Sequence, residues 1–184
     1  MSVALVLVDV INQFFDHRGE NYHPSYEEVL RAIQRLIAAA RQGKRLVIHV
    51  REWHYPNHAD DFEWRKLRPH ARAGSFQAEF PASLPIAVDD LIVHKRRYSA
   101  FFATDLDLLL RERRIGTLIL AGVKTHVCVR ATAQDAFALG YEVLVVREAV
   151  GSNHAHLHEA SLEDIERYMG HVIGLEEAIR LLHG

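Results

Sequence analysis

The stretch LILAGVKTHVCV, residues 118–129, joins an apolar run to a glycine turn and to the start of a predicted helix. The apolar run, Leu118–Ala121, does not alternate with polar residues, which is typical of a strand covered on both faces. The helix is predicted from about His126 to Leu139, and it stops before Gly140, a residue type that is common at helix C-termini. A buried strand followed by a helix is the unit from which parallel sheets are built.

The same strand-then-helix pattern repeats along the chain. Apolar runs predict five further strands, at Val3–Val8, Leu46–Val50, Leu91–Val93, Val143–Val146 and His171–Ile173. Helical spacing of apolar residues predicts four further helices, at Tyr26–Arg41, Thr104–Arg114, Ala155–Met169 and Leu175–Leu182. We therefore expect one α/β domain over residues 1–184, with helices on both faces of a mainly parallel sheet of about six strands.

One part of the chain lacks this pattern. Residues 51–87 contain both tryptophans and four of the five prolines, and they show no long periodic run. A connection of this length within a compact domain is usually functional. We expect it to form a loop or lid over a site.

Composition excludes several classes of protein. The 184 residues include 22 basic and 24 acidic side chains, so the net charge of -2 gives no general attraction to nucleic acid or to anionic membranes. No apolar run approaches the ~20 residues that cross a bilayer. Residues 1–9 have no basic segment of the kind that opens a secretory signal, and a single cysteine suits a reducing compartment. We expect a cytoplasmic protein.

Three reactive side chains follow three different apolar runs. Asp9 follows the first run, Lys95 the run at Leu91–Val93, and Cys128 the glycine turn. In open α/β sheets, ligands bind outside the carboxyl ends of the strands. The sequence therefore predicts an acid, an amine and the only thiol at one edge of the sheet.

Each of these residues has a chemical and a structural interpretation. At the start of a helix, the Cys128 thiolate would be stabilised and its pKa lowered, and backbone N–H groups there could bind an oxyanion; otherwise the thiol is an inert buried side chain. Asp9 is either a general base or a helix cap. Lys95 either keeps the other two ionised or is a solvated strand end.

Several motifs carry a resemblance to a known family. KRRYSAF at residues 95–101 resembles the K-x-R-Y-S-A-F box of the isochorismatase-like cysteine hydrolases, and GVKTHVCV at 122–129 resembles their G-V-x-T-x-x-C-V nucleophile loop. Residues 7–12 and 130–141 are similar to further family segments, and residues 69–80 match more loosely. Nicotinamidases and ureidoacrylate and N-carbamoyl amidohydrolases are members of this family.

The resemblance implies a three-layer α/β/α Rossmann-like fold and a catalytic triad of Asp9, Lys95 and Cys128. It implies a cysteine-dependent hydrolase that cleaves a C–N bond of a small amide, ureido or carbamoyl compound through a thioester. It also implies a cis peptide between Val123 and Lys124, with the N–H groups of Lys124 and Cys128 forming an oxyanion hole. Relatives are often homodimers or homotetramers.

Substrate contacts are expected from aromatic and basic side chains near the triad, with either arginine after the second or third apolar run as the anchor for a carboxylate. The candidates are Phe14, Phe15, Arg51, Trp53, Arg97 and Tyr98. Ordinary packing is the alternative for the aromatic residues.

Several histidines are candidate metal ligands. Nicotinamidases carry a D-x-H…H…H metal constellation, which Glu52, His54, His58 and His70 echo only partly, because a glutamate replaces the aspartate and one histidine comes two residues early. We therefore expect no required cofactor, with zinc or another divalent cation as the alternative.

Other functions stay open on the sequence alone. An isochorismatase-type vinyl-ether hydrolase would need Asp9 but not the thiol. A non-catalytic α/β module that binds a small molecule is weakened because neither G-x-G-x-x-G nor G-x-x-x-x-G-K-[ST] is present. The 13 histidines also permit a metal carrier.

Overall fold

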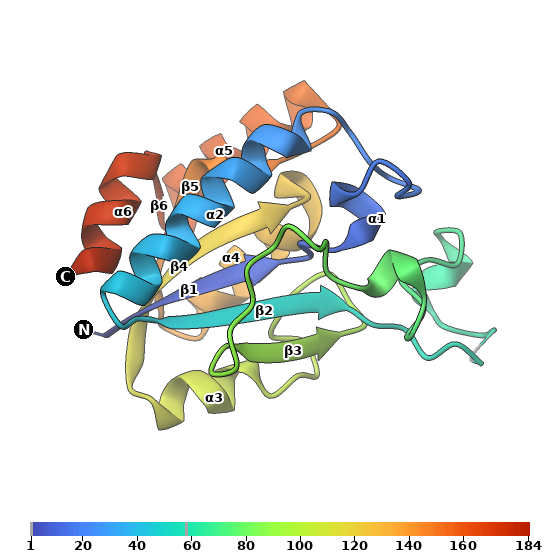
Figure 1. The fold of residues 1–184 in the computed structure, drawn as a ribbon, viewed down its shortest axis with the longest axis horizontal. Helices are drawn as coiled ribbons and strands as arrows, with labels where there is room; N and C mark the ends of the chain where they lie inside the picture. Colours follow the sequence, from blue (N-terminus) through green and yellow to red (C-terminus); the bar gives the residue numbers. More distant parts are fainter. Residues whose placement is uncertain (1, 58) are drawn as a thin grey trace.

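A computed structural model describes residues 2–57 and 59–184, and it contains a six-stranded sheet (Figure 1). The strands are β1 (Ser2–Val8), β2 (Leu46–Glu52), β3 (Leu91–Lys95), β4 (Ile115–Val123), β5 (Glu142–Gly151) and β6 (His171–Ile173). They lie in the order β3-β2-β1-β4-β5-β6, and every neighbouring pair is parallel. The predicted sheet of about six strands is confirmed.

Helices cover both faces of this sheet. They are α1 (Asn12–Phe15), α2 (Tyr26–Gln42), α3 (Leu106–Glu112), α4 (Arg130–Ala138), α5 (Ala155–Tyr168) and α6 (Leu175–His183). The first two and the last share a hydrophobic core on one face, whereas α3, α4 and α5 share the core on the other. The three-layer arrangement is confirmed.

The unbroken apolar run of β1 is explained by these two cores. Leu5 and Leu7 pack in the core with α2 and α6, whereas Ala4, Val6 and Val8 pack in the opposite core. All five side chains are at most 1% exposed. Because successive residues of a strand point to opposite faces, a strand that is covered twice needs apolar residues at every position.

The order of the strands reverses at β1, which lies between β2 and β4. In such sheets the crevice at the reversal, outside the carboxyl ends of the strands, is the usual ligand site. The two central strands approach closely there: a Cβ built on Gly122, whose φ is +118°, would lie 1.9 Å from the carbonyl oxygen of Val8. A glycine is required at this position.

Two predicted helices begin differently. The helix after β3 begins at Leu106 rather than at Thr104, although the Thr104 hydroxyl accepts a hydrogen bond from the Leu106 N–H at 3.3 Å. The segment after β4 begins with a π-helical turn, Thr125–Val129, in which the Val129 N–H donates to the Lys124 carbonyl at 3.2 Å. Cys128 therefore lies in a wide turn that precedes α4.

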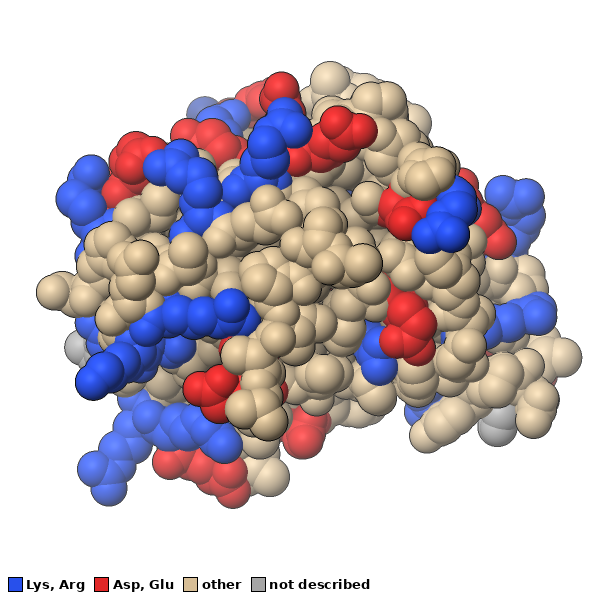
Figure 2. Space-filling view, viewed as in Figure 1, with Lys and Arg blue, Asp and Glu red and all other residues tan. Residues whose placement is uncertain are grey.

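The described residues of the 51–87 segment contain the end of β2 and two 3₁₀ turns, Glu63–Arg65 and Phe76–Ala78. Within the described residues, no helix combines the length and the apolar character needed to span a bilayer. Figure 2 shows basic and acidic side chains interspersed around one face of the molecule, so that face has no broad area of a single charge.

Candidate active site

Asp9 is fixed at the carboxyl end of β1 by its backbone and by one carboxylate oxygen. It has a left-handed φ of 54°, and its N–H donates to the Val50 carbonyl at 2.8 Å. Oδ1 accepts the N–H of Glu52 at 2.8 Å, and the side chain is fully buried. The turn after β1 therefore ties the carboxylate to the neighbouring strand β2.

Lys95, the last residue of β3, connects the three side chains predicted at this edge. Its Nζ lies 2.8 Å from Oδ2 of Asp9 and 3.4 Å from Sγ of Cys128. The ammonium also lies 3.5 Å from Oε1 of Glu52. Residues that are far apart in the sequence thus meet within direct contact distance around one ammonium.

Burial and charge determine the protonation of this group. Burial raises the pKa of Asp9 to about 6, although the Lys95 ammonium opposes this shift. Burial also raises the pKa of the Cys128 thiol well above its ordinary value, and the nearby Asp9 and Glu52 carboxylates raise it further. For Lys95 burial acts in the opposite sense, but Asp9, Cys128 and Glu52 together raise its pKa.

The sequence prediction of a lowered Cys128 pKa is therefore wrong for the free protein. The thiol is buried beside two carboxylates and a single ammonium. That local balance of charge outweighs the favourable effect of the following helix start on an anion.

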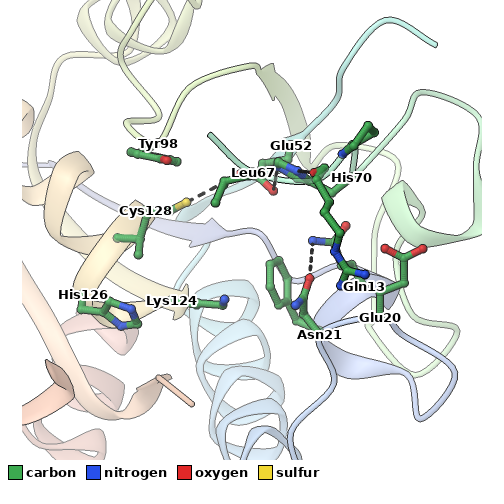
Figure 3. A pocket seen from close by; sticks show the side chains of 14 residues that line it. Gln13, Glu20, Asn21, Glu52, Leu67, His70, Tyr98, Lys124, His126 and Cys128 are labelled. Atoms are coloured by element: carbon green, nitrogen blue, oxygen red, sulfur yellow. Dashed lines mark hydrogen bonds and ion pairs between the residues drawn. The ribbon is translucent and has the colours of Figure 1, made fainter. Parts of the chain in front are cut away.

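A cavity of about 360 Å³ opens beside Cys128 (Figure 3). Six residues that the sequence analysis named line it, namely Phe14, Glu52, His70, Tyr98, Lys124 and Cys128. Residues that the sequence did not single out also contribute, including Gln13, Glu20, Asn21, Leu67, Arg68 and His126. The nucleophile candidate thus faces a space of the size that suits a small molecule.

The structure places other predicted substrate contacts away from this lining. The guanidinium of Arg51 lies over the rings of Trp53 at 3.9 Å and Phe80 at 4.6 Å, and it pairs with Glu79 at 3.0 Å. Trp53 also stacks on His94, with ring centroids 4.7 Å apart. These contacts attach the 51–87 loop to the sheet.

Arg97 and Phe15 have similar structural contacts. Nη1 of Arg97 lies 3.3 Å from Oδ1 of Asp61. Phe15 packs against Tyr26, with ring centroids 5.7 Å apart. Neither residue is among those lining the cavity.

Next to the triad, four side chains could ligate a metal. One atom from each of Glu52, His54, Glu63 and His70 lies within 4.8 Å of the others. Nδ1 of His54 lies 2.9 Å from Oδ2 of Asp61, and its buried Nε2 has no hydrogen-bond partner among the described residues. A histidine held by a carboxylate at one nitrogen, with the other free, is the arrangement found at protein metal sites.

These residues fit a divalent cation such as Zn²⁺, for which imidazole and carboxylate are suitable ligands. Glu63 was not predicted. Its signal in the sequence is an acidic residue that lies between the Glu52-Trp53-His54 segment and His70. His58, which the sequence analysis included, lies outside the described residues.

Glu52 joins the two groups of side chains. Its Oε1 lies 3.9 Å from Sγ of Cys128, whereas its Oε2 lies 3.7 Å from Nε2 of His70. Burial opposes protonation of His70, but its hydrogen bond to Glu63 and the charge of Glu52 raise its pKa to about 9. Without a metal ion, the two carboxylates therefore favour the protonated form of His70, and a metal ion would displace that proton.

The peptide bond between Val123 and Lys124 is cis, as the resemblance implies. Lys124 and Cys128 both line the cavity from the turn after β4. The two residues whose N–H groups are the oxyanion-hole candidates thus both border the cavity that the thiol faces.

Known proteins resemble this chain over most of its length. The chain is 33% identical to the maleamate amidohydrolase of Pseudomonas putida over 183 residues, covering 97% of this chain and 86% of that protein. An isochorismatase-like hydrolase from Alkaliphilus metalliredigens superposes with a TM-score of 0.91 at 32% identity, covering 98% of this chain and 99% of that one.

A third similar protein is described with a metal. The pyrazinamidase of Pyrococcus horikoshii in complex with zinc superposes with a TM-score of 0.85 at 27% identity, covering 95% of this chain and 99% of that chain. The Isochorismatase domain model matches residues 3–177. With a domain match of that extent, the chain belongs to the isochorismatase family.

Proposed function

We propose that this protein is a cysteine amidohydrolase that cleaves the C–N bond of a small amide, ureido or carbamoyl compound. The observation that carries the proposal is the position of the Lys95 ammonium, in contact with both Asp9 and Cys128 beside a cavity. Its relative in Pseudomonas putida is named as an amidohydrolase, which supports the same class of reaction.

The first step is attack by sulfur. A carboxylate oxygen of Asp9 and Sγ of Cys128 lie within 4.8 Å of each other, a separation that one bridging water can span, and Asp9 takes the thiol proton by this route as sulfur attacks. Burial raises the pKa of Asp9 to about 6, which makes it a stronger base than an exposed aspartate. The Lys95 ammonium stabilises the negative charge while it is shared between oxygen and sulfur.

The second step expels the amine. Attack forms a C–S bond and places negative charge on the former carbonyl oxygen, for which the backbone N–H groups of Lys124 and Cys128 are the proposed donors. The oxygen then re-forms its double bond, the C–N bond breaks, and Asp9 returns its proton to the leaving nitrogen. The products at this stage are ammonia or an amine and a thioester on Cys128.

Water completes the cycle. Asp9, again ionised, takes a proton from a water molecule that attacks the thioester carbon. The C–S bond breaks, the proton returns to sulfur, and the free acid leaves. The net reaction consumes one water and releases one amine and one acid, so it needs no oxidant or reductant.

We further propose that Glu52, His54, Glu63 and His70 hold a divalent cation. Such an ion would supply Lewis acidity next to the thiol. The chain's own contribution is to hold His54 through Asp61 and to place Glu52 between the metal ligands and Lys95. The triad steps above do not depend on this ion.

A screen for ammonia release tests the proposed function. Purified protein, with and without added zinc, is incubated with a panel of small amides, ureides and carbamoyl amino acids beside a Cys128→Ala variant. Ammonia release by the wild type and its loss in the variant are expected. Equal release by both proteins would overturn the role of the thiol.

A further inference from the structure

Lys124 brings a positive charge into the cavity without a matching negative charge. The side chain is partly buried, and no carboxylate of the described residues lies within the 4.0 Å of an ion pair. Figure 3 shows it extending from the turn below Cys128 towards Asn21. The ammonium is therefore available to pair with an anion that enters the cavity.

Three other basic side chains near the site are already paired. Lys95 contacts Asp9 and Cys128, as described above. Arg51 pairs with Glu79, and Arg97 pairs with Asp61. The two arginines that the sequence offered as carboxylate anchors are thus engaged in holding the 51–87 loop.

Lys124 has one weak partner of its own. Its Nζ lies 5.7 Å from the centroid of the Phe14 ring, a cation–π contact near the upper limit of useful distance. Such a contact positions the ammonium but does not neutralise it.

The other charged side chains of the cavity lining do not neutralise the Lys124 ammonium. Arg68 adds a second cation that has no ion pair among the described residues. Glu52 lies 3.5 Å from the Lys95 ammonium, and Glu20, like Arg68, is exposed. The space between the thiol and Lys124 therefore favours a ligand that is neutral at the reacting carbonyl and negative a short distance away.

We propose that Lys124 determines specificity by binding a carboxylate of the substrate, with Arg68 assisting. The substrate class is then a short amide that carries a carboxylate, such as a dicarboxylic acid monoamide or a carbamoyl amino acid. The inference rests on the proposed function, since it places the scissile carbonyl at Cys128. The cavity of about 360 Å³ is large enough for such a compound.

A ratio of rates tests this inference without depending on absolute activity. For wild type and variants, kcat/KM is measured with succinamate and with neutral butyramide, and the first is divided by the second. Lys124→Met should lower this ratio about tenfold or more, as expected for the loss of one charge-assisted hydrogen bond. Lys124→Arg should retain most of the preference.

Two further variants distinguish a specific contact at Lys124 from a general effect of the protein's net charge. Lys44 is exposed and is not part of the cavity lining, so Lys44→Met removes the same charge elsewhere and should leave the ratio unchanged. Lys124→Glu should shift the preference towards the cationic 4-aminobutyramide, a gain that a damaged site could not produce. An unchanged ratio in Lys124→Met would overturn the inference while leaving the hydrolase proposal intact.

Binding gives an answer that is independent of turnover. In a Cys128→Ala background, calorimetry measures the affinity for succinamate with Lys124 present and with Lys124→Met. About tenfold weaker binding in the double variant supports the inference, even if the wild type releases no ammonia and the hydrolase proposal fails. Equal affinity, or no binding to either protein, would contradict it.

Discussion

Nζ of Lys95 and Oδ2 of Asp9 lie 2.8 Å apart, with both side chains fully buried. A buried ion pair of this kind is rarely needed for stability, because taking both charges out of water costs about as much as their attraction returns. The ion pair matters for the active site, because the same ammonium contacts Sγ of Cys128 at 3.4 Å.

Replacing Lys95 by Met should destabilise the fold by about 3–5 kcal/mol, because two carboxylates would be buried without their shared cation. Asp9 and Glu52 are the residues affected. The free energy of unfolding in urea measures this effect. The exposed Lys44→Met should have nearly wild-type stability, and a Lys95→Met protein as stable as wild type would show that the ammonium is not the counter-charge.

Asp9→Asn should lower kcat by about 100-fold or more, the usual contribution of a general base. The amide oxygen can still accept the N–H of Glu52, as Oδ1 of Asp9 does, so the local turn should be retained. Circular dichroism checks that the fold is intact. Turnover at the wild-type rate in a folded variant would remove Asp9 from the mechanism.

The pH dependence of kcat/KM should follow the ionisation of Asp9. Burial raises its pKa to about 6, and only the ionised carboxylate can accept the thiol proton. The rate should therefore rise as the pH increases through about 6 and should fall below it. The Asp9→Asn variant should lack this limb; a wild-type rate that stays constant from pH 5 to 7 would contradict the assignment.

Alkylation of Cys128 by iodoacetamide should be slow at neutral pH. Burial raises the pKa of this thiol, so the thiolate forms only in alkaline solution in the absence of substrate. The rate of alkylation, followed by mass spectrometry after removal of metals, should increase steadily above pH 8. Rapid alkylation below pH 7 would restore the lowered pKa that the sequence predicts.

The protein should bind one zinc ion per chain. This is measured by elemental analysis after chelator treatment, addition of zinc and dialysis. His54→Ala should abolish tight binding, and Asp61→Ala should weaken it about 10–100-fold, because Asp61 holds the His54 ring. The exposed His171→Ala serves as a control. Absence of bound zinc in the wild-type protein would refute the metal proposal.

Much of the fold could be predicted because both faces of the sheet are covered. The central strands therefore consist of unbroken apolar runs such as Leu118–Ala121. The length of β5 was missed: its apolar run is interrupted by Arg147 and Glu148, whose side chains are exposed while the strand continues to Gly151. Where a stretch of a strand is exposed to solvent, polar residues are tolerated, and the apolar run that marks the strand in the sequence is interrupted.

The site could be predicted in part for a related reason. Asp9, Lys95 and Cys128 each follow a predicted strand, so parallel topology alone brings them to one edge. The pKa of Cys128 could not be predicted, because it depends on the distances to Asp9 and Glu52 across the chain. The contacts of Arg51 likewise depend on how the irregular 51–87 loop folds back on the sheet.

The central claim is that sulfur attacks the substrate carbonyl and forms a thioester. Hydroxylamine added during turnover of succinamate tests it directly, because this nucleophile competes with water for a thioester. The account predicts that the wild-type protein forms succinyl hydroxamate at the expense of succinate and that Cys128→Ala forms neither. Hydrolysis to succinate alone, or the same product mixture from Cys128→Ala, would contradict it.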